Sequence, residues 1–235
     1  MPVKKSDPRT LAIDIGGTGL KMMVVDSSDR PLSERARVDT PHPATPAAVL
    51  RALRTLVRRQ VPFDRVSAGF PGVVHEGVVK TAPNLHPSWA GFDLAKALSR
   101  ATGKPARVCN DADVQGLGDV RGKGVELVLT LGTGLGSALF VDGRLVPNLE
   151  LGHHPFRGNK TYEDRVGKKA LDKIGKRKWR KRVLEVIAQL EPIFNYRQLY
   201  LGGGNARLLN ADELPANVRI TSNEAGMLGG VALWR

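Results

Sequence analysis

The stretch LAIDIGGTGLK, residues 11–21, joins two apolar runs through a turn of glycines, and the second run continues to residue 25. This pattern predicts two strands, 11–15 and 20–25, connected by a tight turn. Consecutive backbone N–H groups in a glycine turn bind anions, and side chains there would block the approach of a ligand. We therefore expect this turn to bind phosphate, and its candidate residues are Gly16, Gly17, Thr18 and the nearby Lys21.

The same pattern returns in the second half of the chain. Residues 126–132 (ELVLTLG) and 137–142 (SALFVD) are predicted strands, and Gly17-Thr18-Gly19-Leu20 recurs between them as Gly132-Thr133-Gly134-Leu135. We interpret this as an internal duplication that yields two α/β lobes, 1–115 and 116–235, around a central cleft. The further phosphate-binding candidates are Gly132, Thr133, Gly134 and Gly136, with Gly202 and Gly203 after a short predicted strand at 198–201.

Turn residues and apolar periodicity predict the remaining elements. Helices are expected from Thr45-Pro46 onward, from Asp93 to Gly103, and at 162–174, 177–190 and 223–233. Strands are expected at 35–40, 66–70 and 106–109, and a short hairpin at 72–79. One face of the helix 177–190 is apolar, and we interpret its residues as core rather than as part of a ligand site: Trp179, Val183, Ile187 and Leu190.

Composition favours a soluble, cytoplasmic protein. Of the 235 residues, 41% are apolar and 25% are charged, and one cysteine, Cys109, leaves no internal disulfide and no cysteine-rich zinc site. The N-terminal residues lack the apolar stretch of a signal peptide. No apolar run reaches the roughly 18 residues that a membrane span requires.

The net charge of +13 indicates an anionic partner or simply solubilising charge. Nucleic acid, a membrane surface, a nucleotide and polyphosphate all fit the charge alone. Nine Lys or Arg residues and one acid fall between Lys168 and Arg182, which we call the basic segment. This density suits a long polyanion, and it equally suits a solvated helix face. Few aromatic residues are interleaved, which argues against binding of single-stranded nucleic acid.

Asn110 and Asp111 follow an apolar strand, at the position where open α/β sheets bind ligands. A carboxylate there takes the proton from a hydroxyl that attacks phosphorus. The alternative is that Asp111 only caps a helix. Glu150 and His153, three residues apart beside a glycine, have the polar atoms to hold sugar hydroxyls, or they lie in a surface loop. Asn84 lies in a polar loop and offers a further amide.

In this order and spacing, the motifs resemble the ROK family of sugar kinases in the actin-like ATPase superfamily, which has a ribonuclease H-like fold. The stretch TLGTGLGSALFVDGRLVPNLELGH is most similar to the polyphosphate glucokinase branch. The resemblance covers nearly the whole chain, and the residues that carry it are Asp14-Ile-Gly-Gly-Thr18 with Lys21, Pro71-Gly72, Asn84, Asn110-Asp111, Leu131–Gly136, Glu150–His153 and Leu201–Gly204.

The resemblance implies that Asp111 is the general base on the glucose 6-hydroxyl. It implies that the sugar is bound by Asn84, Asn110, Glu150 and His153, and also by Glu163. We expect Mg²⁺ as the metal, with Asp14 as its partner through water, and a homodimer as the assembly. The family's cysteine-rich zinc motif is replaced here by RGNKTYEDRVGK, so zinc is expected to be absent. The chain is also short for the family after Gly118 and in its C-terminal region, which bears on adenine binding more than on phosphate binding.

The sequence thus predicts a polyphosphate-dependent glucokinase, with glucose and polyphosphate as partners and no nucleic acid or membrane. An ATP-dependent glucokinase or hexokinase and a dual-donor glucomannokinase are the alternatives, so the donor and the choice between glucose and mannose stay open. A sugar-responsive regulator requires a DNA-binding module, and about ten residues precede the first strand here. A non-catalytic basic binding protein is disfavoured by the combination of Asp111 with Glu150 and His153.

Overall fold

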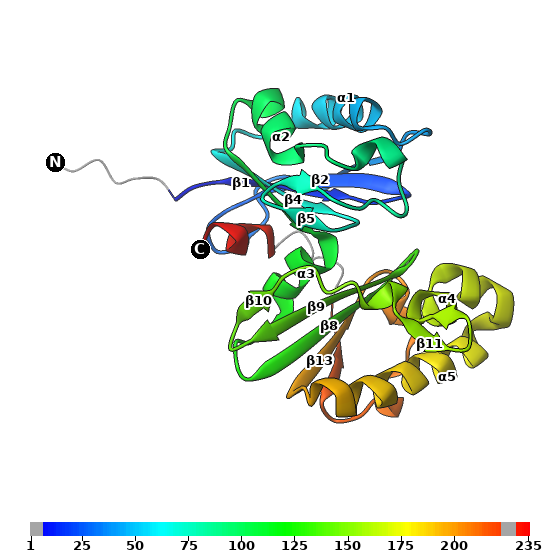
Figure 1. Ribbon diagram of the computed structural model, residues 1–235. Helices are drawn as coiled ribbons and strands as arrows, with labels where there is room; N and C mark the ends of the chain where they lie inside the picture. The colour runs from blue at the N-terminus through cyan, green and yellow to red at the C-terminus, as the bar shows by residue number, and fades with distance from the viewer. Residues whose placement is uncertain (1–6, 222–228) are drawn as a thin grey trace. The chain divides into compact units, whose positions relative to one another are not determined.

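The computed structural model describes residues 7–221 and 229–235 (Figure 1). The described chain divides into two compact units, and the division falls between Val114 and Gln115. Residues 229–235 return to the first unit, whereas residues 115–221 belong to the second. Among the described residues, none of the helices is both long enough and apolar enough to cross a membrane.

A five-stranded sheet forms the first unit, in the order β3-β2-β1-β4-β7. Its first three strands along the sheet pair antiparallel, and β1, β4 and β7 pair parallel. The glycine turn of residues 16–18 connects β1 to β2, as the sequence predicts. The strand bounds are β1 Thr10–Ile15, β2 Gly19–Val25, β3 Ala36–Asp39, β4 Arg65–Phe70 and β7 Ala106–Asn110.

Two helices cover one face of this sheet, α1 (Pro46–Val57) and α2 (Leu94–Thr102). Both helix starts are confirmed, because the side chains of Thr45 and Asp93 accept backbone hydrogen bonds as N-caps. Gly103 ends α2 with a φ of 68°, the left-handed conformation that favours glycine. The segment between β4 and α2 holds the expected hairpin, β5 (Val74–His75) with β6 (Val78–Val79), and a 3₁₀ turn at Pro87–Trp89.

The second unit repeats the first. Its sheet has the order β10-β9-β8-β13-β14, with two antiparallel pairings followed by two parallel ones. The glycine turn of residues 132–134 again connects the antiparallel pair, β8 and β9. The internal duplication inferred from the repeated motif is therefore confirmed in the strand topology. The strand bounds are β8 Val125–Leu131, β9 Leu135–Val141, β10 Arg144–Val146, β13 Gln198–Gly202 and β14 Val218–Ile220.

One predicted helix is wrong in its extent. The sequence predicts a single helix over 162–174, but α4 ends at Val166 and α5 begins at Lys168. Gly167 between them is extended and packs closely, because a Cβ there would lie 2.9 Å from the Glu163 carbonyl oxygen and 3.2 Å from that of Thr133. The full bounds are α4 Tyr162–Val166 and α5 Lys168–Phe194, with a kink at Gly175 where φ is 74°.

After the kink, α5 packs its apolar face against the second sheet. Trp179, Val183, Ile187 and Leu190 are all buried, which confirms the core face predicted for 177–190. The Trp179 indole N–H also donates to the Val166 carbonyl at 2.7 Å, so it joins α5 to α4. Short elements complete the unit: β11 Pro155–Arg157, β12 Lys160–Thr161, and 3₁₀ turns at Leu151–His153, Ala206–Leu208 and Ala211–Glu213.

Helix α3 (Asp111–Asp119) contains the division between the units. The helix predicted over 223–233 lies partly outside the described residues, and its described part is a 3₁₀ helix, Gly229–Trp234. This segment binds the first sheet through Ser67, whose hydroxyl donates to the Gly230 carbonyl at 2.6 Å and accepts from the Trp234 indole at 2.8 Å.

Candidate active site

The first glycine turn is held in shape by backbone hydrogen bonds. Gly16 N–H donates to the Gly19 carbonyl at 3.0 Å, and the Thr40 hydroxyl donates to the Gly16 carbonyl at 2.5 Å. Thr18 stands exposed at the tip of the turn. A preformed, glycine-lined turn with an exposed hydroxyl is the arrangement that anion binding requires, because ordering it on binding costs little further entropy.

Lys21 and Asp14 form an ion pair at the base of this turn. They are directly opposite each other on β2 and β1, and Lys21 Nζ lies 2.8 Å from Asp14 Oδ2. The side chains are 36% and 28% exposed, so both remain accessible to a ligand. The pair therefore places a cation and a carboxylate together beside the turn that is predicted to bind phosphate.

The structure brings Asn84 to the same turn. A Cβ on Gly17 would lie 3.5 Å from the Asn84 carbonyl oxygen and 3.7 Å from its Cβ. The sequence separates these residues by 67 positions, and the prediction linked them only through the family resemblance. In the first unit, a candidate sugar-binding residue and the first phosphate turn are thus neighbours.

Asn110 ends β7 and caps α3. Its Oδ1 accepts from the backbone N–H groups of Ala112 at 2.8 Å and Asp113 at 3.2 Å, and its Nδ2 donates to the Gly72 carbonyl at 3.2 Å. The cap of α3 is therefore Asn110, one residue before the position considered from the sequence. Both ends of this amide are engaged within the protein, and its contact with the sugar stays a prediction.

Asp111 is the first residue of α3, and its Oδ1 accepts from the Ala112 N–H at 2.8 Å. Gly69 on β4 lies directly against it, since a Cβ on Gly69 would be 3.3 Å from the Asp111 Cα. The absence of a side chain at Gly69 thus determines how closely α3 approaches the sheet.

The second glycine turn, residues 132–134, is held in place by a third glycine segment, residues 202–204. Gly203 has a φ of 82°, and a Cβ on it would lie 2.5 to 2.8 Å from the backbone of Leu131. The next side chain, Asn205, donates through Nδ2 to the Gly132 carbonyl at 3.0 Å, and its N–H donates to the Leu131 carbonyl at 2.9 Å. Thr133 is exposed at the tip, as Thr18 is in the first turn. Gly136 lies outside the turn, in β9 opposite Thr130.

The Glu163 carboxylate packs on the second turn. Its Oε2 accepts from the Leu135 N–H at 3.1 Å, and a Cβ on Gly134 would lie 2.0 Å from that oxygen. Glycine at position 134 is therefore required for this contact. The sequence assigned Glu163 to sugar binding by resemblance, and the structure brings it to the turn that is predicted to bind phosphate.

Glu150 and His153 lie together on the turn after β10. His153 Nε2 is 3.7 Å from Glu150 Oε2, and the side chains of His153 and Glu150 are 46% and 32% exposed respectively. Burial raises the pKa of Glu150, nearby His153 lowers it, and the charge of Glu163 raises it again, with a net rise. The 3₁₀ turn fits closely against β9 because a Cβ on Gly152 would lie 2.2 Å from the Leu135 carbonyl oxygen. Glu150, His153 and Glu163 thus form one polar cluster beside the second turn.

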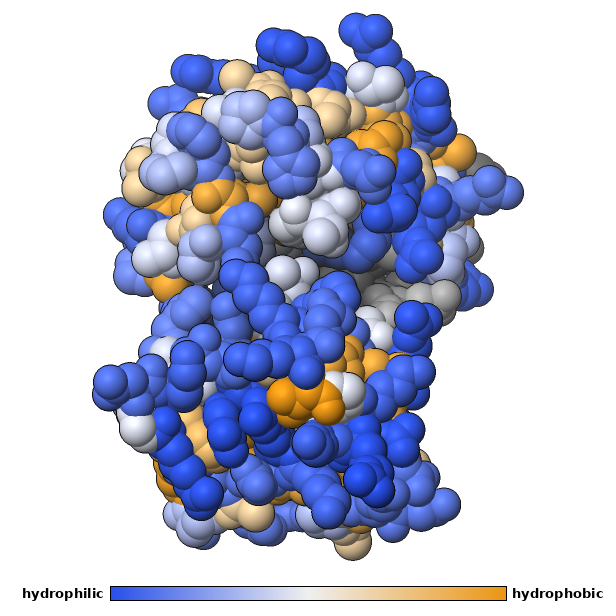
Figure 2. All heavy atoms as spheres, turned by 90° about the vertical axis from the view of Figure 1, so that its right-hand side faces the viewer, coloured by the Kyte–Doolittle hydropathy of each residue, from blue (hydrophilic) through white to orange (hydrophobic). Residues whose placement is uncertain are grey.

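The basic segment begins at this turn. The Lys168 N–H, at the start of α5, donates to the Thr133 carbonyl at 3.1 Å. Figure 2 shows the side of the molecule that carries α4 and α5, and this face of the second unit is mostly hydrophilic. Most of the basic side chains of the segment are exposed, namely Lys168, Lys169, Lys173, Lys176, Arg177, Lys178 and Lys181.

Among residues 7–221 and 229–235, no group of three or more His, Cys, Asp or Glu side chains is gathered as a metal site. A site of one carboxylate still fits Mg²⁺, which keeps several waters and is bound by one or two carboxylates together with substrate phosphates. Asp14, partly exposed beside the turn that is predicted to bind phosphate, offers that arrangement. The predicted absence of zinc stays a prediction.

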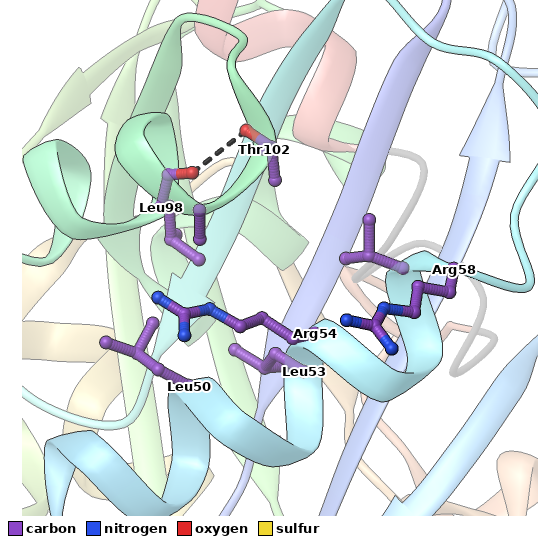
Figure 3. Close-up of a pocket in the computed structure, with 8 residues that line it drawn as sticks. Leu50, Leu53, Arg54, Arg58, Leu98 and Thr102 are labelled. Carbon is purple, nitrogen blue, oxygen red and sulfur yellow. Dashed lines mark hydrogen bonds between the residues drawn. The ribbon is translucent and has the colours of Figure 1, made fainter.

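A hollow of about 130 Å³ lies in the first unit between α1 and α2 (Figure 3). Leu50, Leu53 and Leu98 line it, and Arg54 and Arg58 are its charged groups. It contains none of the residues that the sequence assigned to the site. The candidate site residues of each unit therefore lie around its own glycine turn or at the start of α3, and this hollow is separate from those of the first unit.

Sequence reasoning missed several supporting residues. Asn205 holds the second turn, Gly69 borders the candidate base, and Thr40 bonds the first turn. Of these, Asn205 carried a local signal, because it directly follows three glycines. Gly69 and Thr40 act through contacts between segments distant in sequence, for which a single sequence has no signal.

The family model described as the ROK family matches residues 10–163. A polyphosphate glucokinase of Mycobacterium tuberculosis (strain ATCC 25177 / H37Ra) is 34% identical over 233 residues, covering 92% of this chain and 88% of the relative. The polyphosphate glucokinase of Mycobacterium leprae (strain TN) is also 34% identical, with 94% of this chain and 73% of the relative covered.

Two solved structures extend these findings. The inorganic polyphosphate/ATP-glucomannokinase from Arthrobacter sp. strain KM has a TM-score of 0.89 at 34% identity, covering 97% of this chain and all of that one. A ROK family glucokinase from Streptomyces griseus in complex with glucose and AMPPNP has a TM-score of 0.81 at 22% identity, with 96% and 98% covered. The predicted actin-like ATPase fold is confirmed.

Proposed function

Because this chain belongs to the ROK family, we propose that it transfers a phosphoryl group from inorganic polyphosphate to the 6-hydroxyl of glucose. The observation that carries this proposal is its similarity to polyphosphate glucokinases along almost the whole chain, at 34% identity. The candidate site supports it, since the described residues include a base, a polar cluster suited to a sugar and two anion-binding turns.

Asp111 is the general base of the proposed reaction. Its carboxylate takes the proton of the glucose 6-hydroxyl while that oxygen forms its bond to the terminal phosphorus. The bond from this phosphorus to the bridging oxygen of the donor breaks, and the shortened polyphosphate leaves with the electron pair. The Ala112 N–H at the start of α3 orients the Asp111 carboxylate, and Gly69 allows the helix to sit close to the sheet.

Polar side chains bind the sugar in this proposal. In the second unit, Glu150 and His153 accept and donate hydrogen bonds to neighbouring hydroxyls, and Glu163 lies close enough to influence Glu150 electrostatically. In the first unit, Asn84 supplies an amide beside the glycine turn. Carboxylate and imidazole hydrogen bonds to hydroxyls fix the orientation of the sugar and thus the direction of attack.

The two glycine turns bind the donor phosphates through backbone N–H groups, with Lys21 adding a positive charge. Asp14 would hold Mg²⁺ through water, and the metal would there supply neutralisation of the donor's phosphate charge. Phosphoryl transfer needs little covalent chemistry from the protein, so positioning and charge neutralisation account for most of the catalysis.

The basic segment favours polyphosphate over ATP as donor. A chain of phosphates is far longer than a triphosphate, and the exposed cations of α5 extend away from the Thr133 contact along the helix surface. Binding of such a polyanion releases counterions and is strongly salt-dependent. The Arthrobacter relative is described as a polyphosphate/ATP-glucomannokinase, which makes dual donor use and phosphorylation of mannose the second candidate.

Steady-state kinetics with polyphosphate and with ATP, side by side on glucose and mannose, tests the donor assignment. We expect polyphosphate to support glucose 6-phosphate formation, and product from ATP alone would overturn the assignment. A triple variant, Lys173→Gln, Lys176→Gln and Arg177→Gln, should raise the KM for polyphosphate and flatten its salt dependence. The matched control removes three exposed charges from the first unit, through Arg51→Gln, Arg58→Gln and Arg59→Gln.

We further propose that the protein is a cytoplasmic homodimer that feeds glucose into glycolysis. The support is the family membership and the single free cysteine, which is typical of a reducing compartment. Light scattering coupled to gel filtration measures the mass in solution, and a monomer's mass would contradict the dimer.

A further inference from the structure

We propose that Gln115 is a positioning residue, whose side-chain amide supports the Gly202 backbone and thereby sets the donor-binding turn. This rests on the proposed function, in which the second glycine turn binds the donor and the Gly202–Gly203 segment packs against that turn. Gln115 lies on α3, one helical turn after Asp111, and is only 8% exposed. It is therefore a buried polar residue on the same helix as the base, with no part in the chemistry itself.

The contact between Gln115 and Gly202 leaves no room for a side chain. A Cβ on Gly202 would lie 1.6 Å from Gln115 Nε2 and 2.7 Å from its Cδ. The amide thus occupies the volume that any other residue at position 202 would need. Glycine at this position is explained by the neighbouring glutamine rather than by its own backbone angles.

Gln115 is itself held in place. Its Nε2 donates to Asp119 Oδ2 at 3.4 Å, one turn further along α3, and the Thr221 hydroxyl donates to the same oxygen at 3.0 Å. The helix is seated on β9 here, because a Cβ on Gly116 would lie 2.4 Å from the Phe140 ring. A buried amide with fixed partners loses little entropy when it supports another group.

Gly202 is followed in the chain by the segment from Gly203 to Asn205, which holds the second glycine turn. Gly203 packs on the Leu131 backbone, and Asn205 bonds the carbonyl groups of Leu131 and Gly132. A displacement of Gly202 is therefore passed directly to the turn that binds phosphate. Gln115 thus connects the helix that begins with Asp111 to the backbone of the donor-binding turn.

The test is a double-mutant cycle between Gln115→Ala and Gly202→Ala, with Gln189→Ala, a half-buried glutamine on α5, as the control. Removing the amide leaves Gly202 unsupported, so Gln115→Ala should raise the KM and the dissociation constant for polyphosphate about threefold to tenfold. The KM for glucose should stay within twofold (about 0.4 kcal/mol at most). Gly202→Ala should weaken polyphosphate binding more, because its Cβ expels the glutamine.

In the double variant, the space vacated by Gln115 accepts the methyl group added at position 202, so polyphosphate should bind more tightly than to Gly202→Ala alone. Isothermal titration with polyphosphate of defined length, steady-state kinetics for both substrates and melting temperatures give the readouts. The positioning role would be overturned if the two substitutions changed the free energy of polyphosphate binding additively. It would also be overturned if Gln115→Ala lowered the melting temperature but left the KM and the dissociation constant for polyphosphate unchanged. Wild-type protein that neither binds polyphosphate nor makes glucose 6-phosphate would overturn the proposed function instead.

Discussion

The Glu163 carboxylate accepts a hydrogen bond from the Leu135 backbone N–H at 3.1 Å, immediately after the second glycine turn. The same oxygen would lie 2.0 Å from a Cβ on Gly134. The glycine repeat of this chain is thus needed for two different reasons. At the tip, glycine is predicted to let an anion approach the backbone, and at Gly134 it makes room for an acidic side chain.

A methyl group at position 134 should therefore expel Glu163. We expect Gly134→Ala to lower the free energy of unfolding by about 1–3 kcal/mol, the usual cost of overpacking, and to raise the KM for glucose. Thermal melting and steady-state kinetics measure the two effects. Gly132→Ala is the matched control for stability, because a Cβ there meets no atom within 4 Å. Equal melting temperatures for the two variants would contradict the steric account.

The contact between Gly69 and Asp111 predicts an effect on turnover. A Cβ on Gly69 at 3.3 Å from the Asp111 Cα pushes the start of α3 away from the sheet by a few tenths of an ångström. We expect Gly69→Ala to lower kcat while leaving the KM for glucose nearly unchanged, since small displacements of a base are costly to catalysis. A rise in KM with normal kcat would show that the site at Asp111 is unaffected.

As the pH is lowered, glucose binding should weaken at a higher pH than it would if the sugar were held by an exposed glutamate. Burial raises the pKa of Glu150, His153 opposes this and Glu163 adds to it, so Glu150 becomes protonated at a higher pH than an exposed glutamate. Protonation removes the charge-assisted hydrogen bonds to the sugar. The KM for glucose, measured from pH 8 down to about 5, should rise at the acid end. Glu150→Gln should have a high KM that no longer depends on pH, and an unchanged wild-type slope in this variant would contradict the assignment.

Acid stability should depend on Glu126, which is 1% exposed. Burial alone would raise its pKa, but hydrogen bonds from the backbone of Arg121, Gly122 and Lys123 and from the Tyr200 hydroxyl lower it, for a net fall below 4.5. The ionised Glu126 therefore contributes fully to the free energy of unfolding above the pKa that it has in the unfolded chain. This contribution is lost as the pH falls through the lower pKa of the folded state.

The corresponding experiment compares Glu126→Gln with the wild type by chemical denaturation between pH 7 and about pH 3. We expect the variant to be less stable at pH 7 by about 1–3 kcal/mol, because three backbone N–H donors and the buried Tyr200 hydroxyl lose a charged acceptor. The difference should shrink toward the acid end. A difference that is constant with pH would mean that the Glu126 charge contributes nothing.

The fold was largely predictable because its turns and helix caps are determined by residues close together in the sequence. The glycine turns, the Thr45 and Asp93 caps and the left-handed Gly103 each act within a few residues, and the repeat of Gly-Thr-Gly-Leu revealed the duplication. The break at Gly167 was not predictable, since it arises from a contact with Thr133, 34 positions earlier in the chain. The helical periodicity of the apolar residues continues through that glycine, so it does not indicate the break between α4 and α5.

The residues of the candidate site likewise divide into those that local sequence predicts and those that depend on contacts between distant segments. Asp111, Glu150 and His153 could be proposed from chemistry and motif, because each lies in a short polar stretch at the end of an apolar strand or beside a glycine. Their supports could not, since Gly69 and Gln115 matter only through the segments that fold against them. A single sequence identifies the groups that carry reactive atoms far more readily than the residues that hold those groups in place.

The most direct test of the account compares Asp111→Asn with the wild type, using glucose and polyphosphate as substrates. A general base contributes about 10²- to 10⁴-fold to turnover, so kcat should fall by that amount while calorimetry shows glucose affinity essentially unchanged. The asparagine keeps the size of the side chain and can still accept from the Ala112 N–H. Wild-type turnover to glucose 6-phosphate with this loss in Asp111→Asn is the predicted result, and near-normal kcat in the variant would contradict the central claim.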